Sequence, residues 1–443
     1  MEKFGVNFVL YQKCSYFCRL NEKRTAMGKM RQMTAEVLKR KDRKSGRIMV
    51  FTGARQVGKT TLVRQVLDDY VYLSIEDPVA SPAFLRLTAG QWHELYPKAI
   101  LDEVQKLPEL VESIKSAYDQ FPDVRYVLLG SSQLLLLQKV KESLAGRCTI
   151  FNMYPLTIPE LLTESWDDEI QLSPWQQLLQ QPNVTPSFWP SFALDPTMPK
   201  KQKAWAHYAK FGGYPALADE EMTDDERYLW LKDYVRTYLE RDVRDLASFR
   251  DLEPYVKLQR ALALQTAQTV NVLALSTALG MSSKTVSRYM EYLRLSYQTL
   301  TLQPWERNTN KRLAKMPKIH YMDQGVLQAV LQKRGGTTGA EFESLVVSEL
   351  FKQAQNVFSD ASFYHLRTHD GKEVDLLVEL QDGYFAFEIK MAEHVAKTDA
   401  RHLRGLDAIL DKPIIHAFVL SNDMEVKSFD ENITAVNVAA FLG

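Results

Sequence analysis

The sequence predicts a multidomain α/β protein, with a parallel sheet that carries a phosphate-binding loop at its start and a smaller α/β domain at its end. Three observations support this fold class. The chain has 443 residues, which is too long for a single hydrophobic core. Residues 48–67 follow the order strand, glycine-containing loop and helix, and apolar strands then alternate with helical stretches as far as residue 152. A long helix and two strands with charged side chains follow at residues 339–390.

The composition excludes several classes of protein. The 55 basic and 55 acidic residues give a formal net charge of +0, so any nucleic-acid surface must be local. Three cysteines (Cys14, Cys18 and Cys148) are too few for a disulfide framework, and Cys14 and Cys18 lack a second pair of zinc ligands. No apolar run approaches the ~18 residues of a membrane span, and the N-terminus lacks the pattern of a signal peptide. We therefore expect a cytoplasmic protein.

Residues 53–60 match the pattern G-x-x-x-x-G-K-[ST] at every fixed position. Gly53 and Gly58 let the backbone wrap around a phosphate chain, Lys59 reaches the β- and γ-phosphates, and the Thr60 hydroxyl binds Mg²⁺. A strand at residues 48–52 and a helix that begins at Thr60 provide the expected context, and a helix N-terminus attracts anions. A glycine turn that contains Lys-Thr by chance is the alternative. The predicted nucleotide contacts are Gly53, Ala54, Arg55, Gln56, Val57, Gly58, Lys59, Thr60 and Thr61.

A second apolar strand, which begins at Lys98, ends in the adjacent carboxylates Asp102 and Glu103. In a phosphate-loop ATPase the first carboxylate holds Mg²⁺ and the second polarises the attacking water as a general base. An acidic first turn of a helix gives the same pattern without catalysis. The position of the pair downstream of the phosphate loop favours the catalytic interpretation, so ATP and Mg²⁺ are the predicted ligands.

Two further positions are candidates for the same site. The apolar strand at residues 124–130 is followed by Ser131 and Ser132, and strand ends of a parallel sheet face the ligand crevice. Ser131 is therefore predicted to sense the γ-phosphate, with a plain turn as the alternative. Arg147 precedes the strand at residues 148–152 and is a candidate arginine finger or cis sensor. A structural salt bridge explains Arg147 equally well.

The segments GARQVGKTT, LDEVQKLPEL, VLLGSSQLLL, LAGR and FNMYPLTIPELL, in this order, resemble the AAA+/STAND-like P-loop ATPases of bacteria and archaea. The particular family pairs the ATPase with a C-terminal domain of unknown function. The resemblance continues at residues 211–215, 238–243 and 339–343, and it covers residues 31–443. It implies ATP binding. It also implies that the Gly-Gly-Tyr-Pro segment at residues 212–215 lies in a helical lid that reports the bound nucleotide, with a bare turn as the alternative.

Residues 270–323 predict a winged helix. A helix at 272–279 is followed by a turn at Gly280, a second helix to about Leu295, and wing strands at 298–303 and 318–322. Residues 283–318 contain eight basic and two acidic residues, which is a local net charge of +6. The second helix could enter a DNA major groove while the wing binds phosphates. Winged helices in STAND-type ATPases also serve as intramolecular clamps, so both interpretations stay open. The groove-facing candidates are Lys284, Ser287, Arg288 and Tyr289, and Lys318 belongs to the basic wing.

The C-terminal third resembles the PD-(D/E)xK nuclease core, with Glu343 on a helix at residues 339–355, Asp375 on a strand, and Glu388 and Lys390 on the next strand. Side chains two residues apart on a strand face the same side. Asp375 and Glu388 are predicted to hold Mg²⁺ against a phosphodiester, and Lys390 to activate water or stabilise the developing charge. An inactive domain that binds nucleic acid or protein is one alternative, and a salt-bridge cluster is another.

These observations predict a P-loop NTPase parallel sheet, a helical lid plus winged helix, and a restriction-endonuclease-like α/β domain. The leading hypothesis is an Mg²⁺-dependent ATPase that couples nucleotide state to a DNA-binding or nuclease-like C-terminal domain. The alternative is a signalling ATPase whose C-terminal domain binds a protein partner and cleaves nothing. Residues 1–30 are expected to be poorly integrated into the core. The predicted domains are 1–30, N-terminal extension; 31–162, ATPase core; 163–200, insertion or linker; 201–265, lid; 266–330, winged helix; and 331–443, nuclease-like domain.

The predicted partners are ATP and ADP, with DNA contacted through residues 283–318 and the C-terminal domain. No membrane contact is expected, and the oligomeric state stays open. A chaperone-like remodeller is disfavoured because the sequence contains no identifiable substrate-pore segment.

Overall fold

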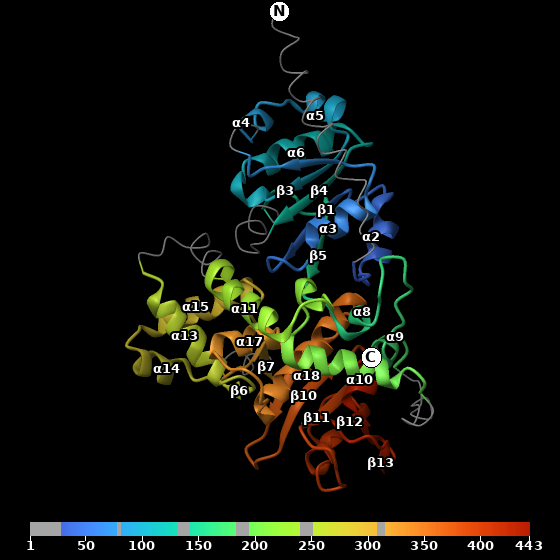
Figure 1. The fold of residues 1–443 in the computed structure, drawn as a ribbon, viewed down its shortest axis with the longest axis vertical. Helices are drawn as coiled ribbons and strands as arrows, with labels where there is room; N and C mark the ends of the chain where they lie inside the picture. The colour runs from blue at the N-terminus through green and yellow to red at the C-terminus, as the bar shows by residue number, and fades with distance from the viewer. Residues whose placement is uncertain (1–27, 78–80, 131–141, 183–194, 240–250, 308–314) are drawn as a thin grey trace, which may run out of the picture.

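The computed structural model describes residues 28–77, 81–130, 142–182, 195–239, 251–307 and 315–443. These residues form two β-sheets, one toward each end of the molecule, with helical segments between and beside them (Figure 1). Among the described helices, none combines the length and the apolar character that a membrane span requires. The protein is thus α/β and multidomain, as the sequence predicts.

The first sheet has five parallel strands in the order β2-β3-β4-β1-β5. Their apolar composition suits a sheet that is covered on both faces. Because β1 and β3 both pair in parallel with β4, the C-terminal ends of all three strands lie at one edge. The strands are β1 (Ile48–Gly53), β2 (Val71–Ser74), β3 (Lys98–Asp102), β4 (Arg125–Gly130) and β5 (Cys148–Met153). The helices around them are α2 (Thr34–Lys41), α3 (Lys59–Val66), α4 (Ser81–Phe84), α5 (Ala89–Leu95), η2 (Val104–Lys106) and α6 (Leu110–Gln120).

The connection to the second sheet contains α8 (Ile158–Leu161), α9 (Pro174–Gln180), α10 (Met198–Phe211), η5 (Pro215–Ala218), α11 (Asp224–Tyr234) and the π-helix η6 (Val235–Leu239). The described part of residues 163–200 is more than a linker. Trp175 of α9 is fully buried, and its ring lies against Phe385, Phe387 and Phe441. A large aromatic surface stabilises such packing, which the acidic and glutamine-rich composition of this segment does not indicate.

The predicted helix pair forms as expected. It consists of α14 (Val272–Leu279) and α15 (Ser283–Leu295), which follow α13 (Glu253–Leu264) and β6 (Gln268–Thr269). Gly280 ends α14 with a φ of 64°, and the Ser282 hydroxyl accepts a hydrogen bond from the Thr285 amide at the start of α15.

The two predicted wing strands, β7 (Thr299–Pro304) and β8 (Lys318–Tyr321), do not form a free hairpin. β7 pairs in parallel with β9 (Ser362–Arg367), so the strands join the C-terminal sheet. That sheet has nine strands in the order β13-β14-β12-β11-β10-β9-β7-β8-β6. Its remaining strands are β10 (Glu373–Glu379), β11 (Tyr384–Lys390), β12 (Ile414–Ser421), β13 (Lys427–Asp430) and β14 (Ile433–Asn437).

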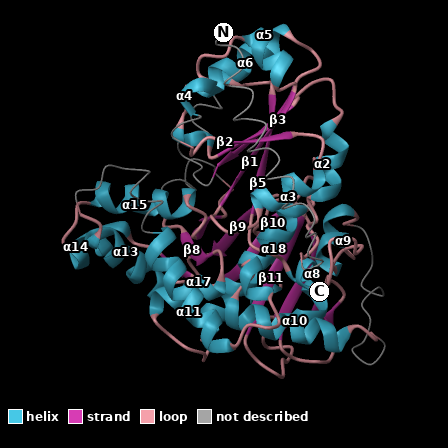
Figure 2. Cartoon of the chain, turned by 45° about the horizontal axis from the view of Figure 1, so that its top comes forward, coloured by secondary structure: helices cyan, strands magenta, loops and turns pink. Residues whose placement is uncertain are grey.

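Helices α17 (Gln324–Leu331), α18 (Gly339–Asn356) and α19 (Val438–Leu442) pack near this sheet, together with η7 (Arg401–Leu403) and η8 (Leu406–Ala408). Figure 2 shows α18 beside the strands of this sheet, and α18 contacts both β8 and β11. One hydrophobic core includes Phe51 of β1, Leu350 of α18 and Phe418 of β12, so the two sheets share buried packing.

Residues 1–27 lie outside the described part of the chain. The expectation of poor integration is wrong for Lys29 and Met30. The Lys29 ammonium donates to the carbonyl of Leu161, and the Met30 amide donates to the hydroxyl of Thr163. Both residues therefore form hydrogen bonds with residues that lie far away in the sequence.

Candidate active site

The phosphate loop connects β1 to α3, and its glycines are required by its shape. Gly53 has a φ of 157°, and a Cβ atom there would lie 2.2 Å from the carbonyl oxygen of Met153 on β5. Gly58 has a φ of 93° and is the N-cap residue of α3. Side chains are strongly disfavoured at both positions. The predicted nucleotide contacts, residues 53–61, make up this loop and the first turn of α3.

Lys59 lies over the loop that precedes it. Its buried ammonium donates hydrogen bonds to the carbonyls of Gly53, at 2.9 Å, and Ala54, at 2.7 Å. A phosphate oxygen carries more negative charge than a carbonyl oxygen and attracts an ammonium more strongly. We therefore expect nucleotide binding to redirect the Lys59 ammonium from the loop carbonyls to the phosphates.

Thr60 and Asp102, the predicted magnesium ligands, are in contact. The Thr60 hydroxyl donates to Oδ2 of Asp102 at 2.8 Å, and the Tyr72 hydroxyl donates to the same oxygen at 2.7 Å. The other carboxylate oxygen accepts from the Glu103 amide at 2.9 Å. Hydroxyl and carboxylate oxygens suit Mg²⁺, which takes its remaining ligands from phosphate and water. These residues therefore fit an ion that binds together with a nucleotide. Tyr72 was not identified from the sequence. The only indication of its role is its position on β2, the strand that pairs with β3.

Glu103 follows β3 in a conformation that is uncommon for a residue with a side chain. Its φ of 59° and ψ of 40° are left-handed. Burial raises the pKa of the Glu103 carboxyl above its ordinary value, although the nearby Arg55 cation works in the opposite direction. A carboxylate with a raised pKa is a better proton acceptor. Strained backbone beside a ligand site is a recognised feature of catalytic residues.

The structure separates Arg147 from the phosphate loop, which corrects its assignment as a cis sensor. Arg147 directly precedes β5, and Cys148 pairs with Ile48 at the start of β1. The length of β1, about 16 Å, lies between that edge and Gly53. The Arg147 guanidinium makes two hydrogen bonds to Asp119, at 2.7 and 3.1 Å, as in the salt-bridge alternative. Ser131 lies outside the described residues.

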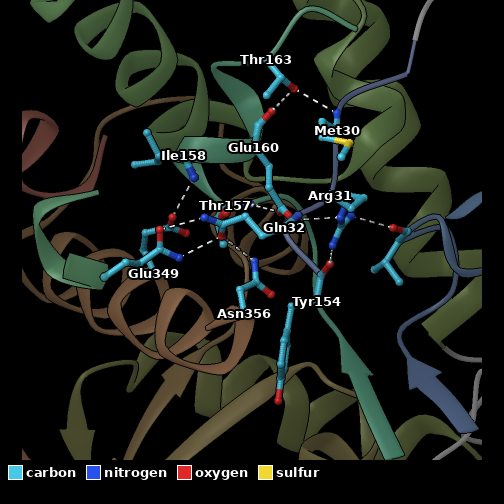
Figure 3. A network of polar contacts seen from close by, with 12 residues as sticks. Met30, Arg31, Gln32, Tyr154, Thr157, Ile158, Glu160, Thr163, Glu349 and Asn356 are labelled. Atoms are coloured by element: carbon cyan, nitrogen blue, oxygen red, sulfur yellow. Dashed lines mark hydrogen bonds and ion pairs between the residues drawn. The ribbon is translucent and has the colours of Figure 1, made fainter. Parts of the chain in front are cut away.

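Arg31 holds the phosphate loop from outside the first sheet (Figure 3). Its guanidinium donates to the carbonyl of Val57 at 3.0 Å and to the carbonyl of Tyr154 at 2.7 Å. It also forms an ion pair with Glu160 at 3.1 Å, and both side chains are almost completely buried. Sequence reasoning missed Arg31 because a single arginine beside a short helix carries no recognisable pattern.

The predicted lid segment also contacts the loop. The Tyr234 hydroxyl donates to the carbonyl of Arg55 at 3.1 Å and lies 3.0 Å from the hydroxyl of Tyr214. A Cβ atom on Gly58 would lie 4.0 Å from the ring of Pro215. Tyr214 and Pro215 belong to the Gly-Gly-Tyr-Pro segment, so this segment lies beside the loop.

A third contact comes from the end of α15. The Tyr297 hydroxyl is hydrogen-bonded to the hydroxyl of Thr52, which precedes the loop on β1. The side-chain oxygen of Asn152 on β5 lies 2.9 Å from the Tyr297 hydroxyl and 3.1 Å from the Thr52 hydroxyl, so one hydroxyl can donate to Asn152 while the other donates to its neighbouring hydroxyl. Tyr297 has a φ of 60°, a conformation that no sequence pattern near it predicts.

Glu160 connects the loop contacts to the C-terminal domain (Figure 3). Besides Arg31, its carboxylate accepts hydrogen bonds from the amides of Gln32 and Thr157, both at 2.9 Å. The next amide, that of Ile158, donates to the buried Glu349 carboxylate of α18 at 2.8 Å. A continuous chain of buried polar contacts therefore links the phosphate loop to α18.

The four charged residues predicted in the C-terminal domain form one cluster. Oε1 of Glu388 accepts a hydrogen bond from Lys390 at 2.6 Å, and Oδ2 of Asp375 accepts from the Ile389 amide at 2.8 Å. Burial, reinforced by the charge of Asp375, raises the pKa of Glu343 to about 8 and that of Glu388 to about 7. The three carboxyl groups are thus close enough to influence one another.

Lys318, which the sequence assigns to the basic wing, lies inside this cluster. Its ammonium is 2.5 Å from Glu343, 3.7 Å from Asp375 and 3.8 Å from Glu373. The assignment of Lys318 to a phosphate-binding wing is wrong because β8 is an interior strand of the nine-stranded sheet. Burial favours the neutral amine, but these carboxylates outweigh it and raise the pKa of Lys318.

The cluster does not fit a bound magnesium ion in this arrangement. Within the described ranges, no group of three or more His, Cys, Asp or Glu side chains is spaced to hold a metal ion. The carboxylates of Glu343 and Asp375 face the Lys318 ammonium.

Other parts of the predicted DNA surface have a mixed outcome. Lys284, Ser287 and Arg288 of α15 are exposed, as a groove-facing helix requires. Tyr289 is buried against Tyr255, which corrects its assignment as a groove-facing residue. Three basic side chains are engaged within the molecule, namely Arg294 with Glu291, Lys315 with Glu306, and Arg307 with the carbonyls of Ile409 and Leu410.

Comparison with protein families identifies three segments. The model of an AAA domain matches residues 45–162, and two models of domains of unknown function, DUF8612 and DUF4143, match residues 202–336 and 338–441. The segment that contains the phosphate loop is therefore an AAA domain. Nucleotide binding follows from this assignment, and an NTPase is the activity that such a domain implies. The role of the other two domains is unknown.

Two mycobacterial relatives, the uncharacterized proteins Rv2008c of Mycobacterium tuberculosis and Mb2031c of Mycobacterium bovis, are each 26% identical over 96% of this chain and 88% of their own length. Among solved structures, the Walker-type ATPase of Pyrococcus abyssi matches 68% of this chain and 94% of its own, at 16% identity and a TM-score of 0.42. A STAND protein with a tetratricopeptide repeat sensor from Pyrococcus horikoshii matches 71% of this chain and 44% of its own, at 10% identity and a TM-score of 0.27.

Proposed function

We propose that this protein is an Mg²⁺-dependent ATP hydrolase that acts as an intramolecular switch. The observation that carries the proposal is that one loop makes two kinds of contact. Thr60, at its end, meets Asp102 as a magnesium site requires. The carbonyls of Val57 and Arg55, within it, accept hydrogen bonds from Arg31 and Tyr234. A nucleotide that reorders this loop therefore changes contacts with distant parts of the chain.

Hydrolysis would use the residues at the C-terminal ends of β1 and β3. Lys59 balances the charge of the β- and γ-phosphates, and Thr60 and Asp102 hold the magnesium ion, which neutralises phosphate charge when it is bound. Glu103 accepts a proton from water while the water oxygen attacks the γ-phosphorus. The bond from that phosphorus to the β–γ bridging oxygen breaks, and ADP and phosphate leave.

The experiment is steady-state ATPase and ATP binding on two variants. Lys59→Ala should lose about 100-fold or more in turnover, because the charge opposite the phosphates is removed. Glu103→Gln should lose a similar factor and still bind ATP, because only the proton acceptor is changed. Glu109→Gln, an exposed residue after η2, and Lys39→Ala, an exposed residue of α2, are the matched controls. Undiminished turnover in Lys59→Ala would refute the assignment.

The switch is tested by hydrogen exchange of the Glu103→Gln variant with ATP and with ADP. We expect the amides of α18 to differ in protection between the two nucleotides, because the contacts of Glu160 and Glu349 link α18 to the loop. Identical protection of α18 in both states would mean that the ATPase and the C-terminal domain act independently.

DNA binding by α15 is a second candidate function, and the exposure of Lys284 and Arg288 favours it. Phosphate contacts by two cations would make binding salt-dependent. Replacing both with alanine should weaken binding to duplex DNA and reduce the magnitude of the salt slope by about two. An unchanged affinity and slope would leave α15 as an intramolecular element. The nuclease interpretation is not part of this proposal, because Lys318 lies among the carboxylates it requires.

A further inference from the structure

The carboxylate cluster of the C-terminal domain already contains a cation. We propose that Lys318 acts as the resident cation of this cluster, closing it to divalent metal ions, and that a latent metal site is exposed only when the Lys318 charge is absent. This inference does not depend on ATP hydrolysis. It rests on the position of one strand, β8, and on the charges around it.

The position of β8 in the sheet brings Lys318 to the cluster. β8 is hydrogen-bonded to β7 on one side and β6 on the other, so the strand is held in register along its length. Ile319 lies in the hydrophobic core that contains Tyr255 and Val286. Because strand side chains alternate between faces, Lys318 points away from that core, toward α18 and β10. Its side chain is only 3% exposed.

The negative charges of the cluster require a nearby cation. Glu343 and Asp375 come from different elements, α18 and β10, and both approach the Lys318 ammonium, as does Glu373. Burying the Glu343 and Asp375 carboxylates together without a cation would be strongly unfavourable. A divalent ion or an ammonium can each satisfy that requirement. In this molecule the chain itself supplies the ammonium, from an element outside the segment that carries the carboxylates.

The neighbouring histidines and Lys390 do not supply the cation between Glu343 and Asp375. His320 follows two residues after Lys318 and His365 lies on β9, and both are buried. Burial, reinforced by the charge of Lys318, lowers the pKa of His365 to about 4 and that of His320 well below its ordinary value. Both rings are therefore neutral near pH 7. Lys390 is committed to Glu388 at 2.6 Å, which leaves Lys318 as the cation between Glu343 and Asp375.

One oxygen of the cluster remains available to a ligand. Oε2 of Glu388 is buried and has no hydrogen-bond partner within the described part of the chain. The charges of Asp375 and Lys318 both act on the Glu388 carboxyl, and a metal ion between Glu343 and Asp375 would compete with the Lys318 ammonium that contacts both. Electrostatic repulsion and volume both oppose simultaneous occupancy. The unsatisfied oxygen indicates a latent site, and Lys318 explains why the site is closed.

The experiment is Mn²⁺ binding to the full-length, nucleotide-free protein, measured from the free-Mn²⁺ signal in electron paramagnetic resonance. Lys318→Met keeps an unbranched side chain that is one atom shorter and removes the charge, and we expect one additional bound Mn²⁺ per chain relative to the wild type. The double variant Lys318→Met/Glu388→Gln should lose that additional ion. Lys318→Arg, which keeps the charge, is the control and should bind no more than the wild type.

Two results would overturn the inference. The first is a wild-type protein that binds an Mn²⁺ ion that is lost in Glu388→Gln, because the cluster would then be open despite Lys318. The second is a folded Lys318→Met variant with no additional site. If that variant does not fold, Lys318→Gln takes its place, and a folded variant without an additional Glu388-dependent ion overturns the inference. A failure of the ATPase assignment would alter none of these outcomes.

Discussion

Replacing Arg31 with methionine tests how strongly the N-terminal segment holds the phosphate loop. The substitution keeps much of the apolar stem and removes three contacts, with the Glu160 carboxylate and with the carbonyls of Val57 and Tyr154. Glu160 is 1% exposed, and removing one partner of such a buried ion pair costs about 3–5 kcal/mol. We therefore expect a loss of this size in the free energy of opening of β1 and α3.

The double variant Arg31→Met/Glu160→Gln separates the ion pair from simple packing. The Gln32 and Thr157 amides donate to different oxygens of Glu160, so a glutamine can still accept from one of them, and the unpaired buried charge is gone. We expect the double variant to be about 2 kcal/mol more stable than Arg31→Met, although the carbonyls of Val57 and Tyr154 still lack their donor.

Native-state hydrogen exchange of the β1 and α3 amides is the assay, because it reports local opening without requiring the whole chain to unfold in one step. ATP affinity is measured in parallel, and we expect it to fall about tenfold, since a loop that is no longer held must be ordered on binding. Lys39→Met, on exposed α2 surface, is the control. An effect of Arg31→Met below about 1 kcal/mol, or a double variant no more stable than Arg31→Met, would refute the reasoning.

Three other predictions concern Tyr297, Gly53 and His416. Tyr297→Phe removes the hydroxyl shared by Thr52 and Asn152 and should destabilise the protein by about 1–2 kcal/mol in thermal unfolding, whereas an unchanged midpoint would mean that this contact contributes nothing. Gly53→Ala should abolish binding of a fluorescent nucleotide because its Cβ would meet the Met153 carbonyl, whereas Gly90→Ala, in open space, should bind normally. Burial lowers the pKa of His416 to about 4, so its contribution to stability is complete above about pH 6.5 and is lost as the pH falls toward 4. On lowering the pH from 7 to 5, the wild type should lose about 2 kcal/mol more than His416→Asn in urea unfolding, and equal losses would contradict the assignment.

The local elements of the site were predictable from the sequence. The phosphate loop has glycines at two positions where the backbone conformation strongly disfavours a side chain. Both glycines belong to a motif that the sequence contains. Asp102 and Glu103 end a short apolar strand, and parallel strands bring such ends to one edge. The helix pair α14 and α15 follows from apolar spacing, Gly280 and a serine cap, all within 25 residues of one another.

What the tertiary structure alone decided is which distant segments meet. Lys318 was predicted to belong to a basic wing, and the pairing of β8 with β6 and β7, together with that of β7 with β9, places it inside the C-terminal sheet instead. Arg31 is 26 residues from its partner Val57, and Tyr297 is 245 residues from its partner Thr52. No local sequence pattern predicts contacts over such separations. The sequence by itself therefore determined the chemistry of the nucleotide loop, since that chemistry is built from neighbours in the chain. The tertiary structure decided what holds the loop and what occupies the acidic cluster, because buried charges find their partners only through the packing of the whole chain.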